Sequence, residues 1–162
     1  MGMRLKSGGA ETDLRGHGIV VTDNNERNHR VINEFRAHGG HVGPPGQGRP
    51  IVLLHHRGRR TGYSYVTPAT YLAFDGDTRV IYVFASKAGG PTNPAWYHNL
   101  IDAGSATVEV GVETFTVSVK EVTGAERDAV FAEQVRRFPN FGEYAEKTAG
   151  IRTIPVLELR RV

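Results

Sequence analysis

Apolar and polar residues follow two different periods along this chain, and the changes between them divide it into elements. Six runs alternate with a period of two or are rich in β-branched and aromatic residues, which predicts strands over residues 51–56, 63–74, 79–86, 106–110, 113–122 and 154–159. Pro68 lacks a backbone donor, so it indicates an edge position or a bulge within its strand. Turn signals at Asp75-Gly76-Asp77 and at Gly111 predict that neighbouring runs pair as antiparallel hairpins.

Four other segments show the helical period and predict helices over residues 24–38, 93–103, 123–138 and 140–147. Asn24 or Asn25 fits the cap of the first helix, and Asn93 with Pro94 fits the start of the second, which Gly104 ends. Thr123 and Glu126 match a capping box at the third. The apolar faces of the first and third helices are Val31, Ile32 and Phe35, and Val130, Phe131, Val135 and Phe138.

Six strands linked mostly by hairpins, with three to four helices, predict an α+β protein built on a closed or nearly closed antiparallel barrel. A chain of 162 residues is within the usual range for one domain, which we place at residues 23–162. Residues 1–22 are polar and rich in glycine, so we expect a flexible tail there. They contain no apolar core for a signal peptide or a membrane span, so we expect a cytoplasmic protein.

Composition removes several classes of site. The chain has no cysteine, which excludes disulfides and thiol chemistry. Its net charge of +3 is modest, and a nucleic-acid site at Arg57-Gly58-Arg59-Arg60, although an alternative, lacks an extended basic stripe. His55 and His56 are neighbours on a strand and point to opposite faces, so we expect no metal site. The GxGxxG and GxxxxGK phosphate motifs are absent.

Two turns are suited to holding an anion. Three arginines, at positions 57, 59 and 60, lie around Gly58 and Gly62, and they form either a solvated hairpin tip or a converging anion site. Ser86-Lys87 leaves the third strand, and Gly89-Gly90 frees backbone amides ahead of a helix N-terminus. Two such turns in one small barrel favour a ligand that carries phosphate or carboxylate groups.

Helical spacing places Trp96 and Asn99 near each other, while Tyr97 points elsewhere. Trp96 is then either an anchor of the core or part of an aromatic wall beside a planar ring.

Motifs spread along the chain resemble the deazaflavin-dependent nitroreductase family. In order they are NHRVINEFRAHGG, LLHHRGRRTG, VTPATYL, DGD, ASKAGG, NPAWYHNL, TGAERDAVF, FPNFGEYAEKT and RTIPVLEL. The resemblance covers nearly the whole chain after the first 22 residues. It implies a split β-barrel related to flavin-binding reductases, with reduced coenzyme F420 as hydride donor. That cofactor is a planar deazaflavin with a phosphodiester and a polyglutamate tail, which suits two basic turns.

The resemblance also implies roles for individual positions. Cofactor contacts fall on Arg59, Arg60, Thr61, Tyr65, Val66, Thr67, Pro68, Ala69, Phe84, Ala85, Ser86, Lys87, Trp96, Tyr97 and Asn99. The substrate side falls on Thr70, Phe141 and Tyr144, with Ser86 and Tyr144 as catalytic hydrogen-bond or proton donors. Three positions depart from the family: Tyr65 stands where arginine is common, Phe141 replaces a tyrosine, and Thr70 replaces a bulkier side chain. Arg57, on the neighbouring predicted strand, could supply the positive charge that is lost where Tyr65 replaces arginine.

The function that follows is hydride transfer from reduced F420 to an electron-poor small molecule, which is a quinone, an enone or a nitro compound. The alternative is a protein that binds or sequesters a deazaflavin, a flavin or a tetrapyrrole without turnover. We expect a monomer. The physiological acceptor, nitroimidazole reduction and competition by FMN stay open.

Overall fold

The computed structural model describes residues 10–13, 18–21, 26–43 and 49–162. The strands are β1 (Ala10–Asp13), β2 (Gly18–Val21), β3 (Ile51–Arg57), β4 (Ser64–Leu72), β5 (Val80–Phe84), β6 (Ser105–Val110), β7 (Glu113–Val122) and β8 (Val156–Arg161). The helices are α1 (Glu26–Ala37), α2 (Ala95–Ala103), α3 (Gly124–Arg137) and α4 (Asn140–Thr148). Two single 3-10 turns, η1 (Phe74–Gly76) and η2 (Lys87–Gly89), follow β4 and β5.

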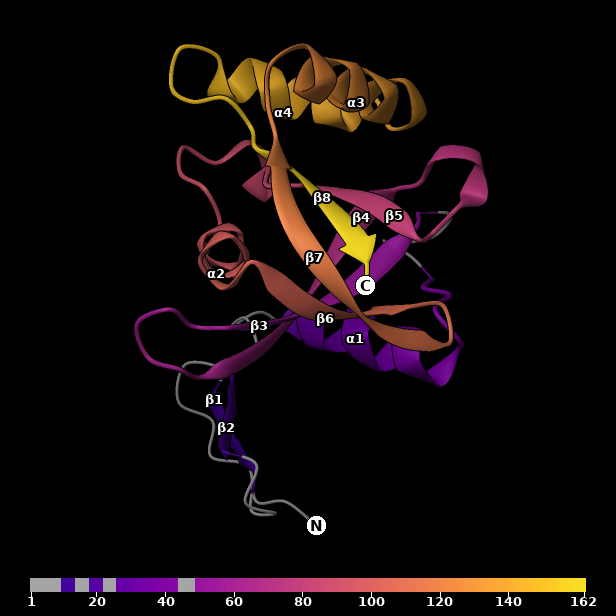
Figure 1. Cartoon of the computed structure of the whole chain (residues 1–162), viewed down its shortest axis with the longest axis vertical. Coiled ribbons are helices and arrows are strands. Elements are labelled where there is room, and N and C mark those ends of the chain that lie inside the picture. Colours follow the sequence, from indigo (N-terminus) through magenta and orange to yellow (C-terminus); the bar gives the residue numbers. More distant parts are fainter. Residues whose placement is uncertain (1–9, 14–17, 22–25, 44–48) are drawn as a thin grey trace.

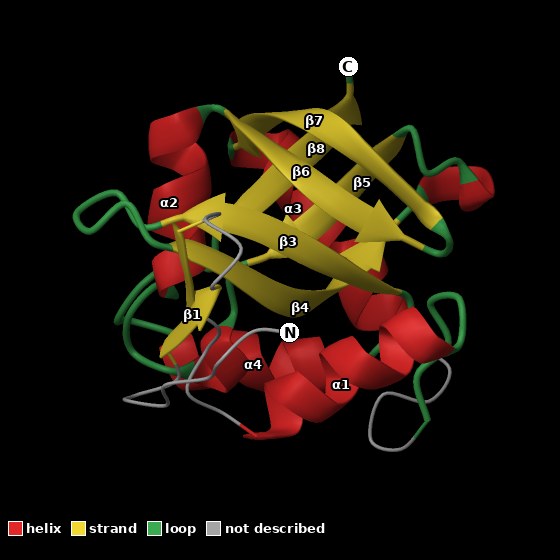
Figure 2. Ribbon diagram, turned by 90° about the horizontal axis from the view of Figure 1, so that it is seen from below, coloured by secondary structure: helices red, strands yellow, loops and turns green. Residues whose placement is uncertain are grey.

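Strands β3 to β8 form an antiparallel barrel. Their order is β4-β3-β6-β7-β8-β5, and β5 pairs back onto β4 to close it. Figure 2 shows the curved sheet, with α2 standing beside one end of β3 and β6. The predicted α+β barrel with peripheral helices is confirmed.

The barrel interior is filled by alternate residues of its strands, such as Val52 and Leu54 of β3 and Val108 of β6, none of which is exposed. The opposite faces of the strands are covered by helices. Phe35 of α1 packs on Leu53 and Val66, and α3 with α4 covers a second outer cluster around Phe84 and Phe131. In Figure 1, α3 and α4 lie above the barrel and α1 lies below it.

Two predicted helix caps are wrong in detail. Pro94, not Asn93, is the N-cap of α2, and the Asn93 side chain instead accepts a hydrogen bond from Arg152. Thr123 is the N-cap of α3, but its side chain makes no capping bond, so the capping box does not form. Gly104 ends α2 in the left-handed conformation, as predicted. The expected cap of α1 at Asn24 or Asn25 lies outside the described residues.

No element is predicted from sequence for residues 10–21, and β1 and β2 add to the predicted set. They pair with each other, and Val20 of β2 lies parallel to Ser64 of β4. A strand of four residues is too short to show a clear alternation of apolar and polar residues. Whether it forms depends on the strand with which it pairs. None of the helices in the described ranges has the length and hydropathy of a membrane-spanning segment.

Candidate functional site

The barrel opens between β4 and β5. These strands share only two residue pairs, Tyr71 with Val83 and Leu72 with Tyr82, whereas β3 and β4 share seven. Continuing the register would place residues 65–70 of β4 opposite β5 and the loop that follows it, but no such pairing forms. The two strand segments predicted to contact the cofactor, 65–70 and 84–87, therefore border one opening.

Pro68 fits this opening. The N–H of Tyr71 donates to Pro50 O on the β3 side, so alternate residues of β4, including Pro68, direct their nitrogen away from β3. That is the side on which β5 has left the ladder. The missing donor of Pro68 therefore costs no hydrogen bond, and the predicted edge position is confirmed.

A cavity of about 440 Å³ adjoins this opening, a size within the usual range for a small-molecule site. It is lined by His56, Gly58, Arg59, Arg60, Thr61, Tyr65, Lys87, Asn93, Ala95, His98 and Asn99. Arg59 and Arg60 come from the turn between β3 and β4, and Lys87 comes from the loop after β5. None of these lining residues is acidic, so the three cations create a positive field that favours an anion.

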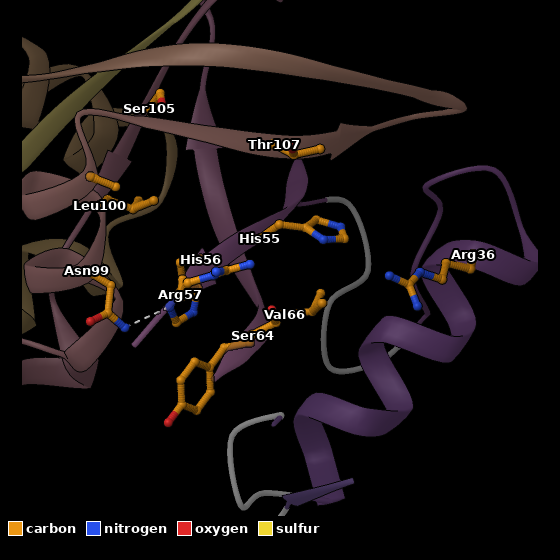
Figure 3. A pocket seen from close by; sticks show the side chains of 12 residues that line it. Arg36, His55, His56, Arg57, Ser64, Val66, Asn99, Leu100, Ser105 and Thr107 are labelled. Atoms are coloured by element: carbon orange, nitrogen blue, oxygen red, sulfur yellow. Dashed lines mark hydrogen bonds between the residues drawn. The ribbon is translucent and has the colours of Figure 1, made fainter. Parts of the chain in front are cut away.

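The arginine turn is held in place from inside the protein. The backbone N–H of Arg59 donates to Asn99 Oδ1 at 3.1 Å, which fixes the orientation of that amide. Asn99 Nδ2 then donates to His56 Nδ1 at 3.0 Å, and the two side chains point toward each other in Figure 3. Because Nδ1 accepts, the proton of neutral His56 is on Nε2, which donates to Thr67 Oγ1 at 2.9 Å.

The three side chains that make these hydrogen bonds are buried. His56, Thr67 and Asn99 are 8%, 4% and 6% exposed, and the His56 ring stacks on Tyr65 with 5.3 Å between centroids. Burial, with the neighbouring His55 as a smaller cause, lowers the pKa of His56 to about 4. A neutral His56 thus links α2 and β4 to the turn that carries Arg59 and Arg60.

Lys87 lies in a loop with an unusual backbone. Both Lys87 and Ala88 have positive φ, 48° and 52°, a conformation that side chains with a Cβ seldom adopt. The Lys87 ammonium donates to Thr92 Oγ1 at 3.0 Å, so the same loop holds its side chain beside the cavity.

Several predicted cofactor residues do not line the cavity. Trp96 and Ala85 are buried in the barrel core, 9% and 0% exposed, and Ala69 is half-buried against the same cluster. Val66 packs under α1 and Phe84 under α3 and α4. Ser86 is half-buried at the start of the strained loop, next to Lys87. The structure thus gathers Arg59, Arg60, Thr61, Tyr65, Lys87 and Asn99 at the cavity and places the others behind or beside it.

Tyr97 faces a different neighbour. Its hydroxyl donates to Glu121 Oε1 of β7 at 2.7 Å. Burial, together with this carboxylate, raises the pKa of Tyr97 to about 12. Its hydroxyl ties α2 to the barrel wall, while Asn99 of the same helix faces the cavity.

The predicted substrate side lies on α4 and at the end of β4. Phe141 is buried against Phe84, with 5.7 Å between ring centroids, and its ring also contacts Tyr144 at 5.2 Å. The Tyr144 hydroxyl accepts from Asn140 Nδ2 at 3.0 Å. Thr70 is half-buried on β4 at the opening. A side chain at Gly89 would come within 3.4 Å of Tyr144 Cα, so the Lys87 loop packs directly on α4.

The cavity also has lining residues that sequence reasoning did not assign to it, chiefly His56, Asn93 and His98. A signal for His56 existed, since the period of two places it on the same face of β3 as Val52 and Leu54. Its partners come from α2 and β4, and sequence spacing gives no measure of those distances.

A second cavity, of about 650 Å³, shares His56, Tyr65 and Asn99 with the first and extends over the outer face of β3. In Figure 3, Arg36 of α1 lies across it from His55. Glu109 of β6 binds both: Arg36 Nη2 donates to it at 2.7 Å and His55 Nε2 is 2.6 Å from the same oxygen. Within the described part of the chain, no cluster of three or more metal-binding side chains occurs.

A six-stranded antiparallel barrel that opens beside a basic cavity defines the split-barrel class. Solved structures support this fold. An F420H2-dependent reductase, FDR-A, is 30% identical, covers 69% of this chain and 95% of its own length, and superposes with a TM-score of 0.60. The heme storage protein HutZ of Vibrio cholerae, 17% identical with a TM-score of 0.51, shares the fold over 81% of this chain and 87% of its own.

Residues 27–160 match the family model described as F420H(2)-dependent quinone reductase. The F420H(2)-dependent quinone reductase Rv1261c of Mycobacterium tuberculosis (strain H37Rv) is 35% identical over 129 residues, which are 78% of this chain and 85% of that protein. The chain belongs to the F420H2-dependent quinone reductase family. These matches confirm the predicted family resemblance. They also confirm the predicted function as an F420H2-dependent oxidoreductase and coenzyme F420 as the cofactor.

Proposed function

We propose that this chain transfers a hydride from reduced F420 to a quinone, with the anionic part of the cofactor bound at the cavity of Arg59, Arg60 and Lys87. The observation that carries the proposal is the convergence of these three cations, from two separate turns, at the open side of the barrel. The quinone as acceptor rests on the family and on the relatives named above.

The residues at the cavity fit such a cofactor. A phosphodiester and glutamate carboxylates need cationic and N–H donors, and the lining supplies two guanidinium groups, one ammonium and the Thr61 hydroxyl without any carboxylate. A planar ring needs an uncovered, partly apolar edge, and residues 65–70 of β4 provide one next to the aromatic ring of Tyr65. Reduced deazaflavin, when bound, supplies the hydride.

The protein's own part is binding and orientation. Arg59, Arg60 and Lys87 would hold the charged end of the cofactor, and the unpaired edge of β4 beside them would leave room for its ring and for an acceptor. The Asn99–His56–Thr67 chain keeps the arginine turn in one place, so little reorganisation is needed on binding.

Ser86 and Tyr144 are proposed to donate a hydrogen bond or a proton to oxygen of the reduced acceptor. The Lys87 loop that begins at Ser86 packs on the helix that carries Tyr144, which supports a shared site. Loss of turnover in either Ser86→Ala or Tyr144→Phe, with F420 affinity unchanged, would support the role. Unchanged turnover in both would assign protonation to solvent.

Turnover tests the function as a whole. Reduced F420 is mixed with menadione and a catalytic amount of protein, and cofactor oxidation is followed by absorbance. We expect oxidation that depends on both protein and menadione and saturates with each. Tight binding of F420 without acceptor-dependent oxidation would contradict the proposal and support a carrier. Nitro compounds and enones tested in parallel rank the acceptor classes.

The monomeric state and the cytoplasmic location remain predictions. One structural relative, 29% identical with a TM-score of 0.61, is described as a domain-swapped dimer. Light scattering on the purified chain, at several concentrations, decides the oligomeric state directly: a mass near 17.8 kDa would support the monomer.

A further inference from the structure

Arg152 lies in the segment between α4 and β8 and reaches across to the loop that carries Lys87. Its guanidinium makes four hydrogen bonds there: Nε to Gly90 O at 3.0 Å, Nη1 to Ala85 O at 3.1 Å and to Asn93 Oδ1 at 2.7 Å, and Nη2 to Ser86 O at 2.9 Å. Four of the five N–H groups of one side chain are thus used on a single loop.

These contacts join the two ends of the loop. Ala85 and Ser86 precede Lys87, whereas Gly90 and Asn93 follow it. The planar guanidinium therefore links the two ends of the loop by hydrogen bonds. The three carbonyl groups that it binds belong to residues that follow the end of β5 at Phe84. Burial lowers the pKa of Arg152 from its ordinary value, which is consistent with a side chain drawn in from solvent.

The loop needs such support. Lys87 and Ala88 both adopt left-handed backbone conformations, which are unfavourable for residues with a Cβ and persist only where the surroundings hold them. Gly89 and Gly90 donate backbone bonds to Ser86 O and Lys87 O, both at 2.9 Å, and so continue the same tight turn. Arg152 binds the carbonyl of Ser86 from the other side.

We infer that Arg152 is a positioning residue for the cofactor site, which sets the Ser86–Lys87 loop in the conformation that presents Lys87 to the anionic part of F420. The inference rests on the proposed function for the identity of the ligand. Arg152 does not line the cavity itself, so its effect passes through the loop. Its geometry matters more than its charge, because a lysine cannot reproduce four divergent bonds.

Arg127 offers a matched control. It is a partly buried arginine that also binds backbone, with Nε and Nη2 donating to Ile154 O at 3.1 and 2.9 Å, and it packs over Phe131 of α3. It therefore shares the chemistry of Arg152 but binds Ile154, just before β8, and neither Arg127 nor Ile154 lines the cavity. A purely structural arginine should behave as Arg127 does.

The experiment measures the dissociation constant of F420 by fluorescence titration, and the melting temperature, for wild type, Arg152→Lys, Arg152→Gln, Arg127→Lys and Arg127→Gln. We expect both Arg152 variants to bind F420 about tenfold more weakly, which is about 1.4 kcal/mol of binding free energy. The Arg127 variants should melt at lower temperature yet keep the wild-type constant. Wild-type affinity in Arg152→Lys and Arg152→Gln, or an equal loss in the Arg127 variants, would overturn the inference.

A second measurement needs no cofactor. Hydrogen exchange of the free protein should show faster exchange at the amides of Gly89 and Gly90 in Arg152→Lys than in wild type or in Arg127→Lys. Unchanged exchange at these amides would contradict the inference that Arg152 orders the loop. If wild type itself fails to bind F420, the proposed function is wrong. The hydrogen-exchange measurement still decides whether Arg152 orders the loop.

Discussion

His56 is kept neutral inside the protein, and this makes stability depend on pH. Its pKa is about 4 in the folded protein against 6.5 in the unfolded chain, so the unfolded state binds more protons between these values. Stability should therefore be full above pH 6.5 and should fall as pH drops toward 4. The contribution lost is about 3 kcal/mol, from about 1.4 kcal/mol per pKa unit.

Urea unfolding at pH 7 and pH 4.5 measures this effect. Wild type should lose about 2 kcal/mol more between the two values than His56→Gln, in which the titrating group is absent. Carboxylates titrate in both proteins and cancel in the difference. An equal loss in wild type and variant would show that His56 is not held neutral.

Gln134 of α3 is a second residue whose environment is unusual. It is fully buried, and neither Nε2 nor Oε1 has a hydrogen-bond partner among the described residues. A buried amide without partners costs about 1–3 kcal/mol. Gln134→Met, of similar length and shape, should therefore raise the free energy of unfolding by about 1 kcal/mol in urea titrations. A lower stability would mean that the amide is satisfied by an ordered water.

At this scale the sequence indicates residue types better than residue roles. The charges of Arg59, Arg60 and Lys87 can be read from their turns, and the structure places all three at one cavity. By contrast, the part played by Asn99 depends on His56, which is 43 positions away in the chain. A contact of that kind follows from how α2 packs beside the end of β3, which no local sequence pattern contains.

At the scale of elements, the turn between β3 and β4 depends on close packing at Gly58. A Cβ at this position would lie 2.6 Å from Thr61 Oγ1 and 3.1 Å from the Tyr65 ring, both at the cavity. Gly58→Ala should therefore displace the arginine turn and weaken F420 binding several-fold, as measured by fluorescence titration.

Gly76 in η1 gives the control for this change. Its φ of +70° makes an alanine unfavourable, by about 1 kcal/mol, but no atom lies within 4 Å of the added Cβ. Gly76→Ala should melt at lower temperature and bind F420 as wild type does. Equal affinities in Gly58→Ala and wild type would show that the turn tolerates the shift.

Elements were predictable where one local pattern decides them. The alternation over β6 and β7 around Gly111, and the apolar stripe of α1 with Ile32 and Phe35, were sufficient. The caps at Asn93 and Thr123 were not: the Asn93 side chain bonds to Arg152 in place of its own helix, and the Thr123 side chain makes no capping bond.

At the scale of the whole molecule, the barrel is closed by only two residue pairs between β4 and β5. Strand β3, by contrast, is paired on both sides, to β4 and to β6. In the free protein, hydrogen exchange should therefore be faster at those amides of residues 65–70 that point away from β3 than at the amides of β3. Binding of F420 should slow exchange at these β4 amides. Equal protection of the two strands would show that the barrel is closed in solution.

The barrel as an architecture could be predicted from six strands linked by hairpins, and the split was implied by the family resemblance. The closing order of the strands has no signal in the sequence of any one of them, since β5 lies between β4 and β8 only because the chain folds back. The same holds for the cavity, whose two basic turns are 27 residues apart at Arg60 and Lys87 and meet at the opening of the barrel.

The most direct measurement of the central claim is an equilibrium titration of F420 into wild type and into the double variant Arg59→Gln, Arg60→Gln, with FMN titrated in parallel. The account predicts saturable binding of F420 to wild type, and binding weaker by about tenfold or more in the double variant at unchanged melting temperature. No saturable binding of F420 to wild type, or equal affinity in the double variant, would contradict it.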